Sequence, residues 1–301
     1  MLDPAEIERI ASAIGTHPSY VEKEWHVVRA IGVIAAMDHG GTLPVFSGGT
    51  SLSVGWGLIK RFSEDIDFRV TMPAAETKSA TERQRRNYRR VVTTAMTEAG
   101  FALMSEARRG NENRFFSADF SYPSSFPVGP SLRPHIQLEM TFESTVLAAI
   151  ERPIQSLVSR ARKQAPEVAA FPCIDPVEAA ADKFSALAWR TCVRDRASKH
   201  DDPRIVRHVH DLAALEKIAL ASPEFKPLAQ RAVAQDTGRG GGRAPAQASE
   251  RFARMLDLLV ADPLWAEEYD TFVRNVSFAA PDEIPSFADA LAALRRLVAS
   301  V

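Results

Sequence analysis

Cysteine is scarce in this chain of 301 residues, in which Cys173 and Cys192 are the only two. Two cysteines cannot supply a disulfide framework, and neither stands near a second cysteine or a histidine at the spacing of a zinc site. We therefore expect both to be small buried hydrophobic residues. The composition indicates neither a disulfide-stapled fold nor a cysteine-based zinc domain.

Long apolar runs and an excess of charge are also missing. No run reaches the roughly 18 apolar residues of a membrane-spanning helix, and the N-terminal sequence MLDPAEIERI is too charged for a secretory signal. We therefore expect a soluble, cytoplasmic protein without a membrane partner.

The formal net charge is −1, so binding to nucleic acid would have to come from local basic patches. Hydrophobic residues make up 46%, which is ample for one large or two smaller domains.

The segment Phe46–Val70 combines a glycine-rich turn with two alternating carboxylates. Its sequence is FSGGTSLSVGWGLIKRFSEDIDFRV. From position 65 to 70 polar and apolar residues alternate, so a strand here places Asp65 and Asp67 together on the face opposite the apolar residues. In phosphoryl-transfer sites Mg²⁺ is typically held by one or two carboxylates together with substrate phosphates. Asp65 and Asp67 are therefore predicted ligands for Mg²⁺ or Mn²⁺.

The turn upstream supplies the phosphate-binding half of this prediction. Gly48 and Gly49 allow a tight turn after a short strand at 45–47. Thr50 and Ser51 stand at the expected start of a helix, where free backbone N–H groups and the helix dipole favour a phosphate. We predict that these four residues bind an NTP. Each motif alone is weak, but both within one strand–turn–helix–strand unit indicate metal-dependent phosphoryl or nucleotidyl transfer.

These motifs resemble those of a known family. The sequence Gly-Gly-Thr-Ser-Leu followed by Arg61–Asp67 is similar to the signature of the AbiEii/MenT nucleotidyltransferase-like toxins, the toxin halves of bacterial type IV-like toxin–antitoxin and phage-defence pairs. The resemblance covers roughly residues 20–220. It includes a Glu-Lys-containing segment at 20–25, in which Glu24 replaces the usual Asp. It also includes a Lys-containing helix at 182–190 and an Arg-x-x-x-Asp-Leu element at 207–212.

The resemblance implies an α+β fold with a nucleotidyltransferase-like mixed-sheet lobe at 1–145. A helical lobe at 146–301 would complete the active-site cleft. It implies that Lys183 and Asp211 act as catalytic residues beside Asp65 and Asp67. The implied reaction transfers NMP from an NTP to the 3′ acceptor end of tRNA, which blocks aminoacylation and growth. A cognate antitoxin is the implied protein partner, and we expect a monomer.

Two basic patches can be identified from helical spacing. Five arginines lie in a helix expected at 81–99, and Arg83, Arg86 and Arg90 form one stripe of it; taken alone, this pattern favours a solvated helix face. In the helix beginning near position 176, a second stripe places two further cations within about 20° of Lys183: Arg190 and Arg194. This stripe suits phosphate binding by Lys183 and Arg190, and the alternative is a salt-bridged surface.

A third carboxylate often completes a two-metal site or activates the attacking hydroxyl. The strand expected at 134–142 places Glu139 on its polar face, and Asp119 on a partner strand at 114–122 is a weaker candidate. Glu139 is therefore a predicted third metal ligand. A group of histidines, His200, His208 and His210, lacks the spacing of a metal motif, so we expect surface or hydrogen-bonding roles for them.

The remaining pattern predicts the outline of the chain. Residues 1–40 are expected to be helical, and everything after 145 is expected to form helices: 176–194, 204–220, 248–260, 263–276 and 286–298. The proline-rich stretch 121–134 and the glycine-rich stretch 237–246 are expected loops.

Alternative functions stay open from the residues alone. One is nucleotidyl or phosphoryl transfer from an NTP to a protein or a small molecule, since nothing in the sequence identifies the acceptor. Another is a non-catalytic member that binds an antitoxin or nucleic acid. Asp65, Asp67 and Lys183 are all retained, which argues against the non-catalytic alternative.

Overall fold

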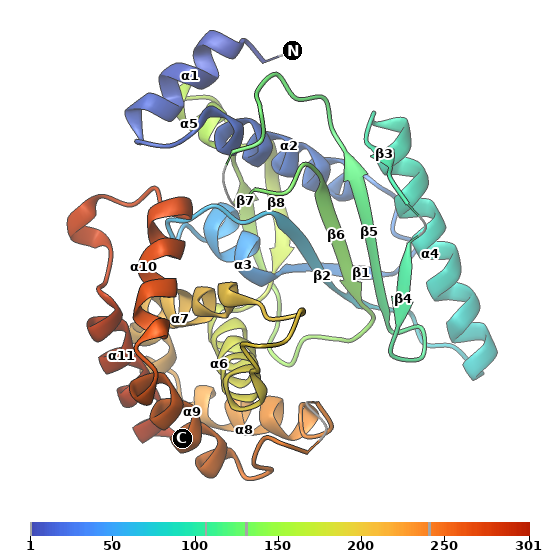
Figure 1. Ribbon diagram of the computed structural model, residues 1–301. Coiled ribbons are helices and arrows are strands. Elements are labelled where there is room, and N and C mark those ends of the chain that lie inside the picture. Colours follow the sequence, from blue (N-terminus) through green and yellow to red (C-terminus); the bar gives the residue numbers. More distant parts are fainter. Residues whose placement is uncertain (1, 106, 130–131, 240–241) are drawn as a thin grey trace. The chain divides into compact units, whose positions relative to one another are not determined.

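The computed structural model describes residues 2–105, 107–129, 132–239 and 242–301 (Figure 1). The chain divides into two compact units, Met1–Ile174 and Asp175–Val301. The first contains a mixed sheet with helices and the second is helical. This arrangement confirms the expected α+β fold class. The boundary falls after Ile174 and not after residue 145, because two further strands join the sheet of the first unit.

Within the described residues, the strands of the first unit form one mixed sheet in the order β3-β5-β6-β2-β1-β8-β7, with β4 paired to β5. Strand β1 pairs antiparallel with β2 and parallel with β8, whereas β2 pairs parallel with β6. The bounds are β1 (Leu43–Ser47), β2 (Asp65–Thr71), β3 (Ala102–Leu103), β4 (Arg108–Gly110), β5 (Phe115–Ser121), β6 (Ile136–Thr141), β7 (Ile150–Ile154) and β8 (Val168–Cys173).

One face of this sheet is apolar and covered by helices. The apolar residues of β2, Ile66, Phe68 and Val70, are at most 2% exposed, whereas the polar residues between them are half-buried. Their core is completed by apolar side chains of α2 (Pro18–Ala35) and α4 (Lys78–Glu98), which lie against this sheet (Figure 1). Helix α1 (Pro4–Ala13) packs on α2 and on the short α5 (Leu157–Ala161). The alternation in β2 therefore leaves its polar side chains on the opposite face.

A helical pattern was expected directly after residue 145, and the structure differs from that expectation. This stretch forms β7, α5 and β8, and β8 pairs with β1 through Phe46 and Cys173. Short apolar runs do not reveal their secondary structure by periodicity, and a parallel partner more than a hundred residues away is invisible in a local pattern. Cys173 is buried, as predicted, while Cys192 is half-buried; both are free thiols.

The second unit follows the helical pattern closely. Its elements are α6 (Pro176–Val193), a 3₁₀ turn (Pro203–Ile205), α7 (Val206–Ala221), α8 (Phe225–Gln235), α9 (Ala248–Ala261), α10 (Leu264–Val276), a second 3₁₀ turn (Pro281–Glu283) and α11 (Phe287–Ser300). Helix α8 was not predicted, although its buried residues recur at helical spacing: Phe225, Leu228, Ala229, Ala232 and Val233. Parts of the two expected loops, residues 130–131 and 240–241, lie outside the described residues. None of the described helices is long and apolar enough to span a bilayer.

Helix α2 buries three adjacent charged side chains, Glu22, Lys23 and Glu24. Buried charges persist only when they are paired or hydrogen-bonded. Glu22 accepts hydrogen bonds from the Ser124 hydroxyl at 2.6 Å and the Ser125 N–H at 2.7 Å. Glu24 accepts from the N–H of Leu157, at the start of α5, at 3.1 and 3.2 Å. The charged segment of α2 therefore fixes loops that are remote in sequence.

Replacing Glu24 by glutamine should flatten the pH dependence of stability. Burial raises the pKa of Glu24 from 4.5 to about 8, so between these values the folded protein keeps a proton that the unfolded chain releases. Stability due to Glu24 is therefore lost as the pH rises through this window, at up to about 1.4 kcal/mol per pH unit. The amide that replaces the carboxyl stays neutral, so urea titrations of Glu24→Gln at several pH values should show a smaller slope than the wild type.

The exposed Glu8, on α1, provides the matched control. Glu8→Gln makes the same chemical change without removing a buried carboxyl, and its pH slope should equal that of the wild type. If stability of Glu24→Gln changed with pH as steeply as that of the wild type, the raised pKa would not belong to Glu24.

Candidate active site

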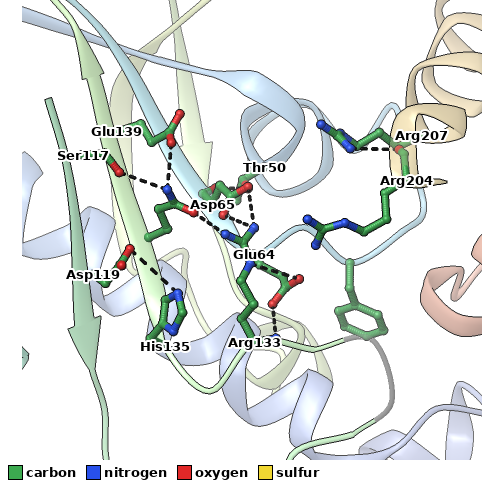
Figure 2. A network of polar contacts seen from close by, with 12 residues as sticks. Thr50, Glu64, Asp65, Ser117, Asp119, Arg133, His135, Glu139, Arg204 and Arg207 are labelled. Carbon is green, nitrogen blue, oxygen red and sulfur yellow. Dashed lines mark hydrogen bonds and ion pairs between the residues drawn. The ribbon is translucent and has the colours of Figure 1, made fainter. Parts of the chain in front are cut away.

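Polar side chains from three neighbouring strands gather on the polar face of the sheet (Figure 2). Strands β2 and β6 run parallel, with Asp67 opposite Glu139 and Asp65 opposite Gln137. The antiparallel β5 places Ser117 opposite Glu139. The sheet register therefore brings the three predicted metal ligands onto one face.

Arg133 holds the first of these carboxylates. Its Nη2 donates to both carboxylate oxygens of Asp65, at 2.7 and 2.9 Å, and its Nη1 donates to the Gln137 amide oxygen. The Gln137 amide nitrogen donates in turn to Glu139 at 2.9 Å and to the Ser117 hydroxyl at 3.0 Å. A continuous chain of hydrogen bonds thus links Asp65 to Glu139 (Figure 2). Sequence analysis missed Arg133, whose only signal was a charged residue just before a strand that carries a candidate carboxylate.

Two negative charges lie close together in this network. Burial raises the pKa of the Glu139 carboxyl, and the charge of Asp65 raises it further, while Arg108 and Arg133 oppose the shift. Carboxylate oxygens are ligands that a divalent cation prefers, and a bound cation would relieve the repulsion between Asp65 and Glu139. The described part of the chain nevertheless holds no group of three or more His, Cys, Asp or Glu side chains arranged to bind a metal. The metal-binding roles of Asp65, Asp67 and Glu139 therefore stay predictions.

Asp119, the weaker carboxylate candidate, is engaged elsewhere. It lies 3.3 Å from a guanidinium nitrogen of Arg108 and 3.8 Å from the imidazole of His135. In the β5–β6 register Asp119 faces Gln137, one step along the strands from Glu139. These contacts give Asp119 a structural ion pair at the margin of the site.

The glycine turn packs directly against the second carboxylate. Gly48 has φ of +73°, and a Cβ added to it would lie 1.9 Å from Oδ2 of Asp67. The turn therefore requires glycine for its backbone conformation and for its close approach to Asp67. A Cβ on Gly49 would meet Nη2 of Arg61 at 2.8 Å.

The helix after this turn begins earlier than expected. Helix α3 starts at Gly48 (Gly48–Thr50) and continues as a π-helical turn, Ser51–Gly55, whereas the expected start was Thr50. The Thr50 hydroxyl consequently donates to the backbone carbonyl of Asp65, and Ser51 is 0% exposed. Both hydroxyls are buried in this structure, and phosphate binding by Thr50 and Ser51 stays a prediction.

A buried lysine connects α2 to the carboxylate network. Lys23 is 2% exposed, and its Nζ donates to Glu64 at 2.6 Å and to the carbonyl of Arg133 at 2.8 Å. Burial lowers the pKa of Lys23, and the charge of Glu64 opposes that shift. Glu64 precedes Asp65 on the chain, and Arg133 binds the Asp65 carboxylate. Lys23 therefore positions both neighbours of Asp65, a role that sequence analysis did not assign.

In the second unit, the two predicted catalytic residues form an ion pair. Lys183 on α6 donates to Oδ2 of Asp211 on α7 at 2.7 Å. Lys183 is 8% exposed and Asp211 is 0% exposed, and Nδ1 of His210 lies 3.3 Å from Oδ1 of Asp211. The structure thus brings together two residues that are 28 positions apart in sequence.

The histidines and cations around this pair differ in part from expectation. His208 and His210 are buried, not at the surface, while His200 is exposed as expected. Neither ring nitrogen of His208 has a hydrogen-bond partner among the described residues. Burial, assisted by Arg207, lowers the pKa of His208 well below its usual value, so its imidazole is neutral.

The expected stripe of three cations separates into different environments. Arg194 lies just beyond the end of α6 and forms paired hydrogen bonds to Asp201 and Glu268 at 2.7 to 2.8 Å, so it is a structural ion-pair residue. Arg190 is half-buried, with its guanidinium 5.0 Å from the ring centre of Trp189. Burial lowers the pKa of Arg190, and among the described residues its Nε has no partner. Arg190 keeps its predicted role as a phosphate-binding candidate.

Known proteins resemble this chain in sequence pattern and in fold. A family model described as "Nucleotidyl transferase AbiEii toxin, Type IV TA system" matches residues 35–293. Among solved structures, the fold is similar to MenT4, nucleotidyltransferase toxin Rv2826c from Mycobacterium tuberculosis H37Rv, with a TM-score of 0.55 and 16% identity. That similarity covers 100% of this chain and 99% of MenT4, and at this identity it shows the fold alone. No curated protein matches the sequence.

Gly48→Ala should destabilise the first unit more than an alanine at another left-handed glycine. A non-glycine residue at positive φ costs about 1–2 kcal/mol, and displacing Asp67 adds an overpacking cost of about 1–3 kcal/mol. Gly57 has φ of +63° with nothing within 4 Å of an added Cβ, so Gly57→Ala carries the backbone cost alone. Urea denaturation should show the larger loss for Gly48→Ala, and equal losses would refute the close contact.

Lys23 and Glu64 should show strong energetic coupling. Lys23→Met leaves Glu64 without its buried partner, and loss of one member of a buried pair costs about 3–5 kcal/mol. The double variant Lys23→Met/Glu64→Gln leaves neither charge behind, so it should be more stable than the sum of the single losses predicts, by about 1–3 kcal/mol. A double-mutant cycle from urea unfolding measures this coupling. Additive losses would show that the ion pair contributes nothing specific.

Proposed function

Because the chain belongs to the AbiEii family of nucleotidyltransferase toxins, we propose that it transfers NMP from an NTP to the 3′ acceptor end of tRNA. The observation that carries the proposal is the glycine turn packed against Asp67, beside Asp65 held by Arg133. This unit joins a backbone turn suited to close approach by a ligand with carboxylates suited to a divalent cation. The family also implies a cognate antitoxin as the protein partner.

In the proposed reaction, the 3′ hydroxyl oxygen of the RNA bonds to the α-phosphorus, and the bond from this phosphorus to the β-phosphate bridging oxygen breaks. Pyrophosphate leaves with the electron pair, and the hydroxyl proton passes to a base. Asp65 and Asp67 would hold Mg²⁺ or Mn²⁺, which neutralises phosphate charge when bound. Arg133 orients the Asp65 carboxylate by its paired hydrogen bonds. Positioning and electrostatics of this kind dominate catalysis of phosphoryl transfer.

Glu139 is suited to accept the proton of the attacking hydroxyl. Its raised pKa moves it toward neutral pH, where a carboxylate is a more effective base. The Gln137 amide donates to one oxygen of Glu139 and thereby sets its orientation. A role as third metal ligand is the alternative assignment for the same carboxylate.

Within the second unit, Lys183, Asp211 and Arg190 are the residues proposed to act on phosphate. The ion pair with Asp211 fixes the direction of the Lys183 ammonium, a compact charge suited to phosphate oxygens. The half-buried guanidinium of Arg190 is suited to bidentate contact with a phosphate. Lys183→Met should therefore reduce transfer, even though the variant retains both carboxylates of β2.

The test is transfer of label to RNA. Purified full-length protein is incubated with total tRNA, Mg²⁺ and each α-³²P-labelled NTP in separate reactions. We expect label on tRNA with the wild type and a loss of at least about a hundredfold in Asp67→Asn, because the variant removes a charged ligand from the site. Asp38→Asn is the control. Asp38 is an exposed turn residue that accepts from the Gly40 N–H, a contact that Asn retains.

The other outcomes have distinct meanings. Absence of label on tRNA with every NTP would overturn tRNA as the acceptor. Reactions with γ-labelled ATP or GTP and cellular protein would then distinguish phosphoryl transfer to a protein from a protein without transfer activity. Equal labelling by wild type and Asp67→Asn would refute the site itself.

A further inference from the structure

Four guanidinium groups gather where α4 meets the edge of the sheet. We define the arginine cluster as Arg85, Arg86 and Arg89 of α4 with Arg109 of β4. Arg85 and Arg89 each lie with the guanidinium carbon 5.8 Å from the ring centre of Phe142, which directly follows β6. In the β4–β5 pairing, Arg109 stands opposite Phe116, whose side chain is buried. The cluster therefore belongs to the helix-covered side of the sheet.

The arginine cluster has no acidic partner in the part of the chain that the structure describes. None of its four guanidinium groups forms an ion pair or a side-chain hydrogen bond there. Arg89 is only 7% exposed, yet within the described ranges its Nη1 has no acceptor, and neither has Nε of Arg85. Burial lowers the pKa of Arg89, and the charges of Arg109, Arg85 and Arg86 lower it further. These like charges repel one another, and no carboxylate of the described residues compensates them.

Two half-buried arginines elsewhere in the chain have carboxylate partners. Arg133 forms paired hydrogen bonds to Asp65, and Arg194 forms such pairs with both Asp201 and Glu268. A buried charge left without a partner is costly. Arg89 is such a charge among the described residues, and three further guanidinium groups lie near it, so the cluster indicates a site completed by a ligand. The ligand must be an anion with several acceptor oxygens, because several guanidinium forks converge on one region.

We infer that the arginine cluster binds backbone phosphates of RNA, so that it holds the body of the RNA acceptor while the 3′ end reacts. Guanidinium forks match phosphate geometry, and arginines one helical turn apart can contact more than one phosphate of a strand. The formal net charge of −1 provides no general attraction to RNA, so a local patch has to supply it. The inference rests on the proposed function, since RNA is taken as the acceptor.

Strand β4 connects this surface to the carboxylate site. Successive side chains of a strand point to opposite faces, so Arg108 and Arg109 lie on different sides of the sheet. Arg108 donates to the hydroxyl of Ser117, at 3.2 Å, and Ser117 belongs to the hydrogen-bond chain of the site. Basic groups of one edge hairpin thus extend from the arginine cluster to the carboxylate face.

The stripe expected from sequence, Arg83, Arg86 and Arg90, is not the set that converges. Arg83 and Arg90 are exposed, and Arg90 bonds to Asn87 within its own helix. The contacts with Phe142 belong instead to Arg85 and Arg89. The two exposed arginines therefore provide a matched control on the same helix.

The test measures RNA binding without transfer. Fluorescence anisotropy of labelled tRNA is followed with full-length protein in EDTA, from about 50 to 200 mM KCl. The double variant Arg85→Gln/Arg109→Gln should weaken binding on the order of tenfold and reduce the slope of log K against log salt by about two. The control Arg83→Gln/Arg90→Gln removes the same charge and should stay within about twofold of the wild type at each salt concentration. Circular dichroism and thermal unfolding of both variants verify that each one folds.

The outcomes distinguish failure of the arginine cluster as an RNA site from failure of the proposed transfer reaction. Equal weakening in the cluster variant and the control would overturn the arginine cluster as a site. If the cluster variant lost binding to purified antitoxin but kept RNA binding, the surface would be assigned to a protein partner. That result would also overturn the arginine cluster as an RNA site. Cluster-dependent binding of tRNA without labelling would refute the proposed transfer but support the RNA site. Normal labelling by the cluster variant, with unchanged KM for tRNA, would refute the site and leave the proposed function standing.

Discussion

The ammonium group of Lys23 is the contact on which the geometry of the carboxylate site depends. It joins Glu64, 41 positions away in sequence, to the carbonyl of Arg133, which is 110 positions away. Glu64 immediately precedes Asp65, and the guanidinium of Arg133 holds the Asp65 carboxylate. Since Lys23 is almost fully buried, water cannot replace either partner at low cost. Helix α2 therefore contributes more than an apolar face to the sheet, because it also orients the functional face through a buried charge.

Charged side chains with a partner of opposite charge can be distinguished from those that lie beside like charges. The first are structural residues, and the second are candidate ligand-binding residues. Lys23, Arg133 and Arg194 find carboxylate partners within their own unit, and these pairs hold loops and strands in place. At Glu139 the neighbouring charge of Asp65 is of the same sign, which adds to the effect of burial and raises the pKa of the carboxyl. At Arg89 the neighbouring charges are also of the same sign. Where like charges lie this close, a bound ion or substrate of opposite charge is favoured.

Local sequence patterns predicted those features that depend on neighbouring residues. The alternation from position 65 to 70 identified strand β2 and its polar face, and helical spacing located most helices of the second unit to within two residues. The same reasoning missed β7 and β8, since a strand is stabilised by partners that are distant in sequence. It predicted surface or hydrogen-bonding roles for His208 and His210 and did not predict that both are buried, because a short polar segment does not reveal which helices will cover it.

The sequence by itself identified the family, the α+β class and the placement of Asp65 and Asp67 on one face of β2, because motifs and alternation are local patterns. Only the tertiary structure decided that Arg133 binds Asp65, that Lys23 supports both, and that the Thr50 and Ser51 hydroxyls are buried. It also decided that Arg85 and Arg89, and not the exposed stripe of α4, stack on Phe142. The physical reason is the same in each case. Ion pairs and the burial of polar groups are set by residues that folding brings together from distant segments, and side-chain spacing along one element does not identify those partners.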